Sequence, residues 1–216
     1  MIFRDRRAAG RSLALLLSEH RGAPGLLVLA LPRGGVPVGF EVARALDAPL
    51  DVFVVRKIGV PGNEELAMGA IASGGIRVLS PDLIRMRGVT PEALEEAAGR
   101  EGAELARRER AYRGIRPACD ISHRRVIVVD DGMATGSTMR AAVIAIRSAG
   151  PARVIVAAPV ASEEAAAALK AIADECVCAL RPPAFASVGA WYEDFRQTTD
   201  EEVRELLQAA GSAAGS

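Results

Sequence analysis

Residues 126–138 of the chain read VIVVDDGMATGST. This stretch starts with an apolar run from Val126 to Val129, continues with two adjacent acids and ends in a loop of small residues. An apolar run without alternation is typical of a strand that is buried on both faces. Ligands of parallel sheets bind beyond the carboxyl ends of the strands. A ligand is therefore expected at the loop from Gly132 to Thr138.

The loop has the features of a phosphate site. Gly132 and Gly136 permit backbone angles that direct successive N–H groups to one point. A helix is expected to begin at Thr138, and its free N–H groups and positive dipole end favour an anion. The side chains of Thr135 and Ser137 add hydroxyl donors. We therefore predict a phosphate monoester here; the alternative is a strand–turn–helix without a ligand.

Asp130 and Asp131 extend this prediction to a sugar phosphate. A site for phosphate alone disfavours two adjacent carboxylates, because they repel the anion. Carboxylates accept hydrogen bonds from hydroxyl groups, so the pair suits a ligand that carries hydroxyls near its phosphate. A ribose 5-phosphate meets this description through its 2- and 3-hydroxyls.

Outside this stretch, apolar runs alternate with amphipathic segments. Strands are expected at residues 26–31, 52–55, 126–129, 154–160 and 176–180, and helices at 36–46, 138–148 and 163–173. This alternation predicts an α/β, doubly wound, mostly parallel sheet with helices on both faces. In the strand order 2-1-3-4-5 the first and third strands flank the topological switch point. The loops that follow these two strands are therefore expected to face one crevice.

Two regions interrupt the alternation within the single domain expected over residues 1–216. Residues 66–79 contain two apolar stretches separated by a Gly-Gly pair, which predicts a hairpin. Residues 80–116 are highly charged with helical spacing, which predicts a helical insertion with a solvated face that could serve as a lid or hood. Residues 184–210 are predicted to form a C-terminal hood segment, and 211–216 a disordered tail.

Composition limits the classes of function. The 216 residues include 27 basic and 27 acidic side chains, and this zero balance argues against a nucleic-acid partner. Cys119, Cys176 and Cys178 have no metal-site spacing and are expected to be buried structural thiols. There is neither a signal peptide nor a membrane-length apolar run, so we expect a cytoplasmic protein without membrane contact. His20 and His123 are expected to be structural.

The run at 126–138 resembles the phosphoribosyl-diphosphate motif of type I phosphoribosyltransferases: an apolar strand, two acids and a small-residue loop that ends in Thr-Gly-Ser-Thr. The resemblance implies that Asp130 and Asp131 hold the ribose hydroxyls. It also implies that the loop binds the 5-phosphate through Ala134, Thr135, Gly136, Ser137 and Thr138.

A second and a third segment resemble other parts of this family. Residues 31–35, LPRGG, follow the first strand, where Gly34 and Gly35 let the backbone approach a ligand and Arg33 supplies charge. They are similar to the family's diphosphate loop, which carries a cis peptide; a plain turn is the alternative. Arg56 and Lys57 belong to a stretch similar to the Arg-Lys-x-Gly-x-x-Pro of adenine phosphoribosyltransferases, and strand-end cations that reach solvent are the alternative.

A fourth segment, FASVGAWYEDF at residues 185–195, contains the only Trp of the chain. It is similar to the Val-Gly-x-x-x-acid segment of hypoxanthine-guanine phosphoribosyltransferases. This resemblance implies that Phe185 or Trp191 stacks on the acceptor and that Glu193 or Asp194 lies near the diphosphate or the metal. An aromatic cluster that packs the C-terminal helix onto the core is an equal alternative.

The resemblance implies a Mg²⁺-dependent enzyme of nucleotide metabolism. Such an enzyme transfers phosphoribosyl from 5-phosphoribosyl 1-diphosphate to a small-molecule acceptor, with a nucleobase nitrogen expected, and releases diphosphate. Asp130, Asp131, Arg56 and Lys57 are the expected catalytic residues. Mg²⁺ would be held mainly by substrate oxygens, with Asp130, Asp131 and Glu193 as further ligands. A non-catalytic regulator that senses the same ligand and a hydrolase using the same crevice are alternatives, and a homodimer is left open.

Overall fold

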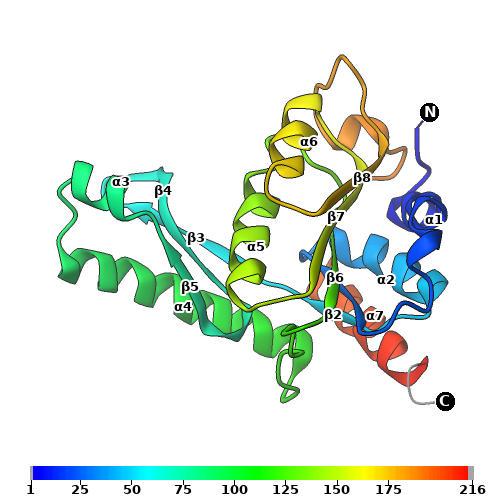
Figure 1. Ribbon diagram of the computed structural model, residues 1–216, viewed down its shortest axis with the longest axis horizontal. Coiled ribbons are helices and arrows are strands. Elements are labelled where there is room, and N and C mark those ends of the chain that lie inside the picture. The colour runs from blue at the N-terminus through cyan, green and yellow to red at the C-terminus, as the bar shows by residue number, and fades with distance from the viewer. Residues whose placement is uncertain (1, 214–216) are drawn as a thin grey trace.

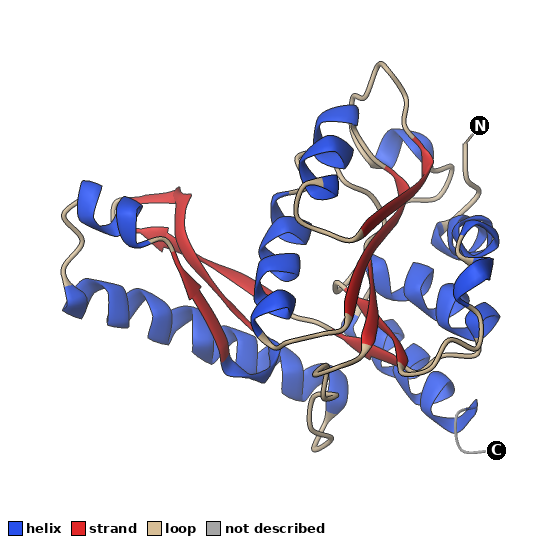
Figure 2. Ribbon diagram, in the orientation of Figure 1, coloured by secondary structure: helices blue, strands red, loops and turns tan. Residues whose placement is uncertain are grey.

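A five-stranded parallel sheet lies at the centre of the protein, in a computed structural model that describes residues 2–213 (Figures 1 and 2). The strand order is β2-β1-β6-β7-β8, and every neighbouring pair is parallel. This order is the predicted one, so the doubly wound fold is confirmed. The strands are Leu26–Ala30 (β1), Leu50–Val52 (β2), Arg125–Val129 (β6), Arg153–Val160 (β7) and Glu175–Leu180 (β8).

Helices cover both faces of this sheet (Figure 1). Alternate side chains of a strand point to opposite faces. Leu27 and Val128 pack with α5 and α6 on one face, whereas Val28 and Ile127 pack with α1 and α2 on the other. Burial on both faces explains why the strands are continuously apolar. The helices are Arg6–Leu16 (α1), Gly35–Leu46 (α2), Ser137–Ser148 (α5) and Glu163–Lys170 (α6).

A second, antiparallel sheet extends away from the parallel one, at the left of Figure 1. It has the order β3-β4-β5, and we call this sheet together with α3 and α4 the arm, residues 55–113. The predicted hairpin is confirmed, because β4 pairs antiparallel with β5. The third strand was not predicted. The elements are Val55–Val60 (β3), Asn63–Ala72 (β4), Ile76–Leu79 (β5), Pro81–Met86 (α3) and Pro91–Arg113 (α4).

The prediction of one strand at residues 52–55 is wrong. β2 ends at Val52, and β3 of the arm begins at Val55. The N–H of Phe53 still donates to the Ala30 carbonyl of the parallel sheet at 2.9 Å. The N–H of Val54 donates instead to the Ser73 hydroxyl in the arm at 2.9 Å. The chain therefore passes from one sheet to the other between these two residues.

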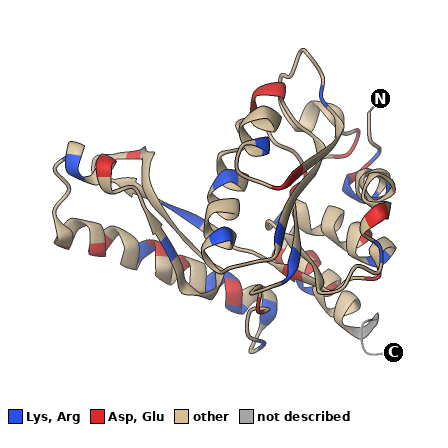
Figure 3. Ribbon diagram, in the orientation of Figure 1, with Lys and Arg blue, Asp and Glu red and all other residues tan. Residues whose placement is uncertain are grey.

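Helix α4 carries charges of both signs along its length (Figure 3), and all of these residues except Arg113 are at least partly exposed. Opposite charges four positions apart form ion pairs along it, with Glu104 and Arg108 joined at 2.7 Å as one example. One side of the helix is apolar: Ala97 and Ala98 pack on the arm sheet, and Leu105 packs near β2. The predicted solvated face is present, but the apolar side was not predicted, because small apolar residues spaced along a charged helix give only a weak amphipathic pattern.

The C-terminal helix and the exposure of the cysteines both differ from the predictions. Asp200–Ala213 form α7, so this helix includes the first three residues of the predicted tail, and residues 214–216 lie outside the described part. Cys119 is exposed rather than buried. Cys176 and Cys178 are half-buried on one face of β8, with their sulfur atoms 3.9 Å apart. Among residues 2–213, no helix has the length and apolar character needed to cross a membrane.

Candidate active site

Two glycine-bearing loops meet at the carboxyl ends of β1 and β6. These strands are adjacent and in register, with Ala30 opposite Val129. A Cβ atom added to Gly35 would lie 2.7 Å from the Val129 carbonyl oxygen, and one added to Gly34 would lie 2.0 Å from Oδ2 of Asp131. The absence of a side chain at both positions therefore lets the loop after β1 contact the acids after β6. The Pro32–Arg33 peptide is cis, as the family resemblance implied for this loop.

The two adjacent acids have different surroundings. Oδ1 of Asp130 accepts the N–H of Asp131 at 2.8 Å. Burial, and then the neighbouring charge of Asp131, raise the pKa of Asp130 well above its ordinary value. Oδ2 of Asp131 forms an ion pair with Nε of Arg6 at 2.8 Å, and both side chains are nearly buried. The Tyr192 hydroxyl donates to the Asp131 carbonyl at 2.5 Å, so the end of β6 is held from two sides.

The predicted 5-phosphate loop is open to solvent at the start of α5. Gly136 has a φ of 67° and immediately precedes this helix. The Thr135 and Ser137 hydroxyls are 3.2 Å apart, and Nζ of Lys57 donates to the Ser137 hydroxyl at 2.9 Å. A hydroxyl pair, an ammonium group and a helix N-terminus therefore converge at this loop, a combination that suits an oxyanion.

The three cations predicted for the site, Arg33, Arg56 and Lys57, have different partners in the structure. Lys57 contacts the 5-phosphate loop, whereas Arg56 forms an ion pair with Glu101 of α4 at 2.7 Å. Both line a cavity of about 360 Å³ that also includes Thr138. Arg33 lines a different cavity from the one that Arg56 and Lys57 line. The arm explains the difference, because β3 carries the two cations out of the parallel sheet.

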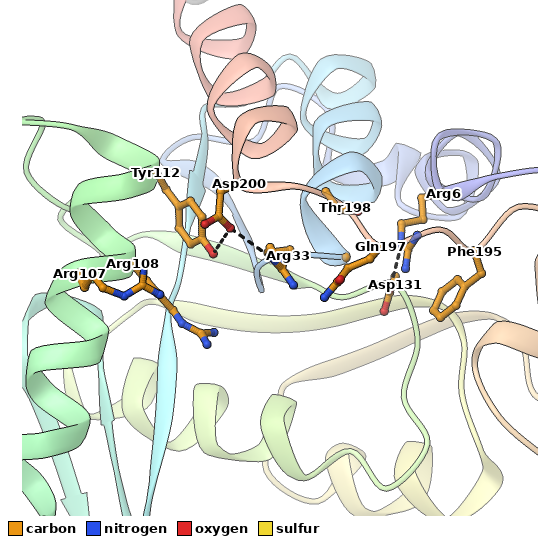
Figure 4. Close-up of a pocket in the computed structure, with 11 residues that line it drawn as sticks. Arg6, Arg33, Arg107, Arg108, Tyr112, Asp131, Phe195, Gln197, Thr198 and Asp200 are labelled. Carbon is orange, nitrogen blue, oxygen red and sulfur yellow. Dashed lines mark hydrogen bonds and ion pairs between the residues drawn. The ribbon is translucent and has the colours of Figure 1, made fainter.

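The cavity beside the two acids has a volume of about 440 Å³ (Figure 4). It lies between the loop after β1, helix α4 of the arm and the segment that leads into α7. Two predicted residues of the diphosphate loop and one predicted acid face it. Its lining comprises Arg6, Arg33, Gly34, Arg107, Arg108, Tyr112, Asp131, Phe195, Gln197, Thr198 and Asp200.

Several residues of this cavity were not predicted from the sequence. Arg6 lies in the Arg-rich run RDRR, where nothing distinguishes it from its neighbours. Arg107 and Arg108 come from the charged helix, and Tyr112 donates its hydroxyl to Asp200 of α7 at 3.2 Å. Each is brought to the site by a tertiary contact with a segment distant in sequence, so no local pattern marks it.

The aromatic segment is arranged differently from either expectation. Phe185 and Trp191 pack beside Phe3 and Val160, so they join the N-terminal residues to the sheet rather than line the cavity. Phe195 lines the cavity instead, with the Arg6 guanidinium 4.0 Å from its ring centroid. The Tyr192 ring lies 5.0 Å from the Phe195 ring.

The predicted acids and histidines nearby are not part of either cavity. Glu193 is exposed, and its N–H donates to the Phe3 carbonyl at 2.8 Å. Asp194 pairs with Arg196 at 2.7 Å. His20 is buried and its Nε2 lies 3.5 Å from Glu175, which agrees with a structural role.

The fold and this geometry together define a class of protein. A doubly wound sheet places an acid-bearing loop and a second glycine loop side by side at its topological switch point. This is the arrangement implied for a protein of the type I phosphoribosyltransferase fold.

Comparison with known proteins gives the family. A family model described as the phosphoribosyl transferase domain matches residues 5–192, and the chain belongs to this family of transferases. Two curated Mycobacterium tuberculosis relatives, from strains CDC 1551 and H37Rv, are named "Putative phosphoribosyl transferase" and are 44% identical over 209 residues. The match covers 97% of this chain and 47% of each relative, so the chain spans about half their length.

A solved structure supports the fold. The crystal structure of TT1426 from Thermus thermophilus is 48% identical in sequence and superposes with a TM-score of 0.88. The match covers 97% of this chain and 99% of that one, so it includes the arm as well as the parallel sheet.

Proposed function

We propose that the protein transfers phosphoribosyl from 5-phosphoribosyl 1-diphosphate to a small-molecule acceptor and releases diphosphate. The observation that carries the proposal is the contact between the two glycine loops: Gly34 approaches Asp131 so closely that a Cβ would lie 2.0 Å from its Oδ2. This contact supports the proposal, because the loop suited to diphosphate lies beside an acid suited to ribose hydroxyls. The loop suited to phosphate follows that acid directly in the chain.

Each part of the ligand has a proposed set of partners. The 5-phosphate binds residues 134–138 together with Lys57, which already donates to the Ser137 hydroxyl at 2.9 Å. Asp130 and Asp131 accept hydrogen bonds from the ribose hydroxyls. The diphosphate binds the loop of Arg33, Gly34 and Gly35 after β1.

The reaction breaks the bond between ribose C1 and the diphosphate oxygen, which leaves with the electron pair. The lone pair of an acceptor nitrogen forms the new bond to C1, and the acceptor then loses its proton. Positive charge develops on the ribose ring and negative charge on the leaving group. The carboxylates of Asp130 and Asp131 lie near the first, and the guanidinium of Arg33 stabilises the second. Arg56 would act only after release from Glu101, with which it pairs at 2.7 Å.

The residues present are compatible with Mg²⁺ bound largely by substrate oxygens. Carboxylate oxygens are ligands that Mg²⁺ prefers, and Asp130 has a raised pKa that a nearby cation or hydroxyl donor would offset. Oδ2 of Asp131 is paired with Arg6, so these side chains provide only part of a coordination shell. Asp130 and Asp131 would hold the ion, which supplies charge neutralisation to the departing diphosphate. Glu193, outside the cavity lining, is a weaker candidate ligand.

The elements above the crevice are proposed to exclude water from the ribose cation. α4 of the insertion at residues 80–116 and the segment at 184–210 both contribute side chains to the lining of the larger cavity. A nucleobase is the acceptor we propose to test first.

The test measures binding and turnover with the same protein. The chain is incubated with Mg²⁺, 5-phosphoribosyl 1-diphosphate and a panel of purine and pyrimidine bases, and diphosphate release is recorded. We expect release with at least one acceptor and loss of ligand binding in the double variant Asp130→Asn/Asp131→Asn. Ligand binding without release on any acceptor would favour the non-catalytic sensor. Unchanged ligand affinity in the double variant would contradict the site assignment.

A further inference from the structure

Helix α4 supplies a wall of the larger cavity that faces the diphosphate loop. Arg107, Arg108 and Tyr112 all line this cavity together with Arg33 (Figure 4). In that view Arg33 lies between these three side chains on one side and Asp131 on the other. The wall is therefore on the diphosphate side of the predicted ribose position, away from Phe195.

The cavity carries an excess of positive charge. Four arginines and two carboxylates belong to its lining. Arg6 is neutralised by Asp131 at 2.8 Å, and Arg33 approaches Asp200 at 3.4 Å. Arg107 and Arg108 share Glu104 as a partner at 2.7 Å, and this acid lies outside the lining. Two guanidinium groups with one carboxylate between them favour a further anion in the cavity.

Asp200 already occupies an anion position in this cavity. Its Oδ1 is 3.4 Å from the Arg33 guanidinium and accepts the Tyr112 hydroxyl at 3.2 Å. The pKa of Tyr112 is raised, first by burial and next by the charge of Asp200. An oxygen of a phosphoryl group accepts the same two hydrogen bonds, so it can replace the carboxylate.

We propose that Arg107 and Arg108, with Tyr112, bind the terminal phosphate of the diphosphate group, and that the ligand displaces Asp200 from Arg33. The proposal rests on the proposed function and assigns a binding role to the insertion. The two arginines are binding residues on a fixed helix rather than on a mobile loop. Tyr112 is 4% exposed, and the adjacent Arg113 joins Asp51 of β2 at 2.8 Å. The end of α4 is therefore held against the parallel sheet.

Three ligands separate this site from the rest of the crevice. Titration calorimetry with Mg²⁺ compares 5-phosphoribosyl 1-diphosphate, inorganic diphosphate and ribose 5-phosphate. In the double variant Arg107→Gln/Arg108→Gln we expect the Kd of the first two ligands to rise by about tenfold or more, the effect of losing a charge-assisted hydrogen bond. The Kd of ribose 5-phosphate should not change. Arg110→Gln, an exposed arginine on the same helix outside the cavity lining, is the matched control.

Two more variants remove competing explanations. Loss of both arginines frees the Glu104 carboxylate, whose repulsion could weaken binding by itself. A triple variant that adds Glu104→Gln should keep the weakened diphosphate binding if the arginines act directly. Asp200→Asn removes the competing charge and should lower the Kd of inorganic diphosphate by several-fold.

The outcomes distinguish the inference from the function on which it rests. Wild-type affinity for diphosphate in the double variant, or recovery of that affinity in the triple variant, would overturn the inference alone. An equal loss of ribose 5-phosphate affinity would overturn it too, because the arginines would then act outside the diphosphate subsite. Unchanged or weaker diphosphate binding in Asp200→Asn would refute the displacement of Asp200. Failure of the wild-type chain to bind any of the three ligands would overturn both proposals.

Discussion

Among single residues, Asp130 and Asp131 show how far adjacent side chains can differ. Asp131 has a cationic partner in Arg6 at 2.8 Å. The Asp130 carboxylate accepts a hydrogen bond from the Asp131 N–H. Burial and the neighbouring charge of Asp131 nevertheless raise the pKa of Asp130. The ionised form of Asp130 is therefore disfavoured at this position. A hydroxyl donor or a cation at this position would offset that cost.

We expect Asp130→Asn to stabilise the unliganded protein at neutral pH while abolishing ligand binding. Between 3.8, the ordinary pKa, and the raised value, the folded chain keeps a proton that the unfolded chain has released. The free energy of unfolding of the wild type therefore falls as the pH rises through this window. The Asn variant lacks this fall, because its amide does not titrate. Urea denaturation from neutral pH down to pH 3.8 measures the difference, which should shrink towards the acid end.

The control for this prediction is Asp82→Asn, which changes an exposed acid on α3. Its stability difference from the wild type should stay small across the series. A constant difference for Asp130→Asn at every pH would show that packing, rather than the carboxyl charge, determines the effect.

Residue chemistry could be predicted from the sequence only where it is local. The acids and the 5-phosphate loop are consecutive, so one strand–loop–helix segment contains them and its pattern is visible. Arg6 and Asp131 are separated by 125 positions, and their pairing depends on how α1 packs. Lys57 was expected to be a catalytic cation, and its position beside Ser137 depends on the arm, which no local pattern shows.

At the scale of the elements, the packing of α1 against α2 requires a residue without a side chain at the contact. Helix α1 packs against α2 through Gly10, where an added Cβ would lie 2.7 Å from the Val38 carbonyl oxygen and 2.9 Å from Cβ of Glu41. Neither backbone nor Cβ can move without shifting a helix. The sequence did predict α2, but it held no sign of this contact, because a glycine within a helix is by itself only a weak helix former.

Gly10→Ala should therefore destabilise the protein by about 1–3 kcal/mol, the usual cost of overpacking a core. Gly99→Ala is the matched change in α4, because no atom lies within 4 Å of the added Cβ. There the better helix propensity of Ala should stabilise by up to about 1 kcal/mol. Chemical denaturation gives both values. Equal effects of the two substitutions would contradict the close contact between α1 and α2.

Only the β4–β5 hairpin of the arm could be predicted from the sequence, because the pairing of β3 leaves no clear local pattern. The Gly74-Gly75 turn is local, so the β4–β5 hairpin could be predicted. β3 pairs with β4 through a register shift near Gly59, and its sequence carries two cations that interrupt the apolar pattern. The apolar run that ends at Val55 looked like one strand, because burial in two different sheets gives the same composition.

Across the whole molecule, the arm and the parallel sheet are joined by a buried ion pair. Arg113 at the end of α4 donates to Oδ1 of Asp51 in β2 at 2.8 Å and to the Val52 carbonyl. Asp51 also accepts the N–H of Cys119 at 3.1 Å. The side chains of Arg113 and Asp51 are 4% and 9% exposed, so water cannot replace either partner. We infer that the arm and the sheet unfold together.

Arg113→Ala should lower the stability of the whole chain by about 3–5 kcal/mol, because it leaves the Asp51 carboxylate buried without its partner. Arg85→Ala breaks an exposed pair on the arm and should cost less than about 1 kcal/mol. The double variant Arg113→Ala/Asp51→Ala should be less destabilised than the sum of its single variants, since the buried Asp51 carboxylate is then no longer left without its cation. Trp191, which packs beside β7, reports on the sheet by fluorescence, while circular dichroism also follows the long helix of the arm. Both signals should shift to lower urea concentration together. A Trp191 transition that stays at the wild-type midpoint while the helical signal moves would show that the arm unfolds independently.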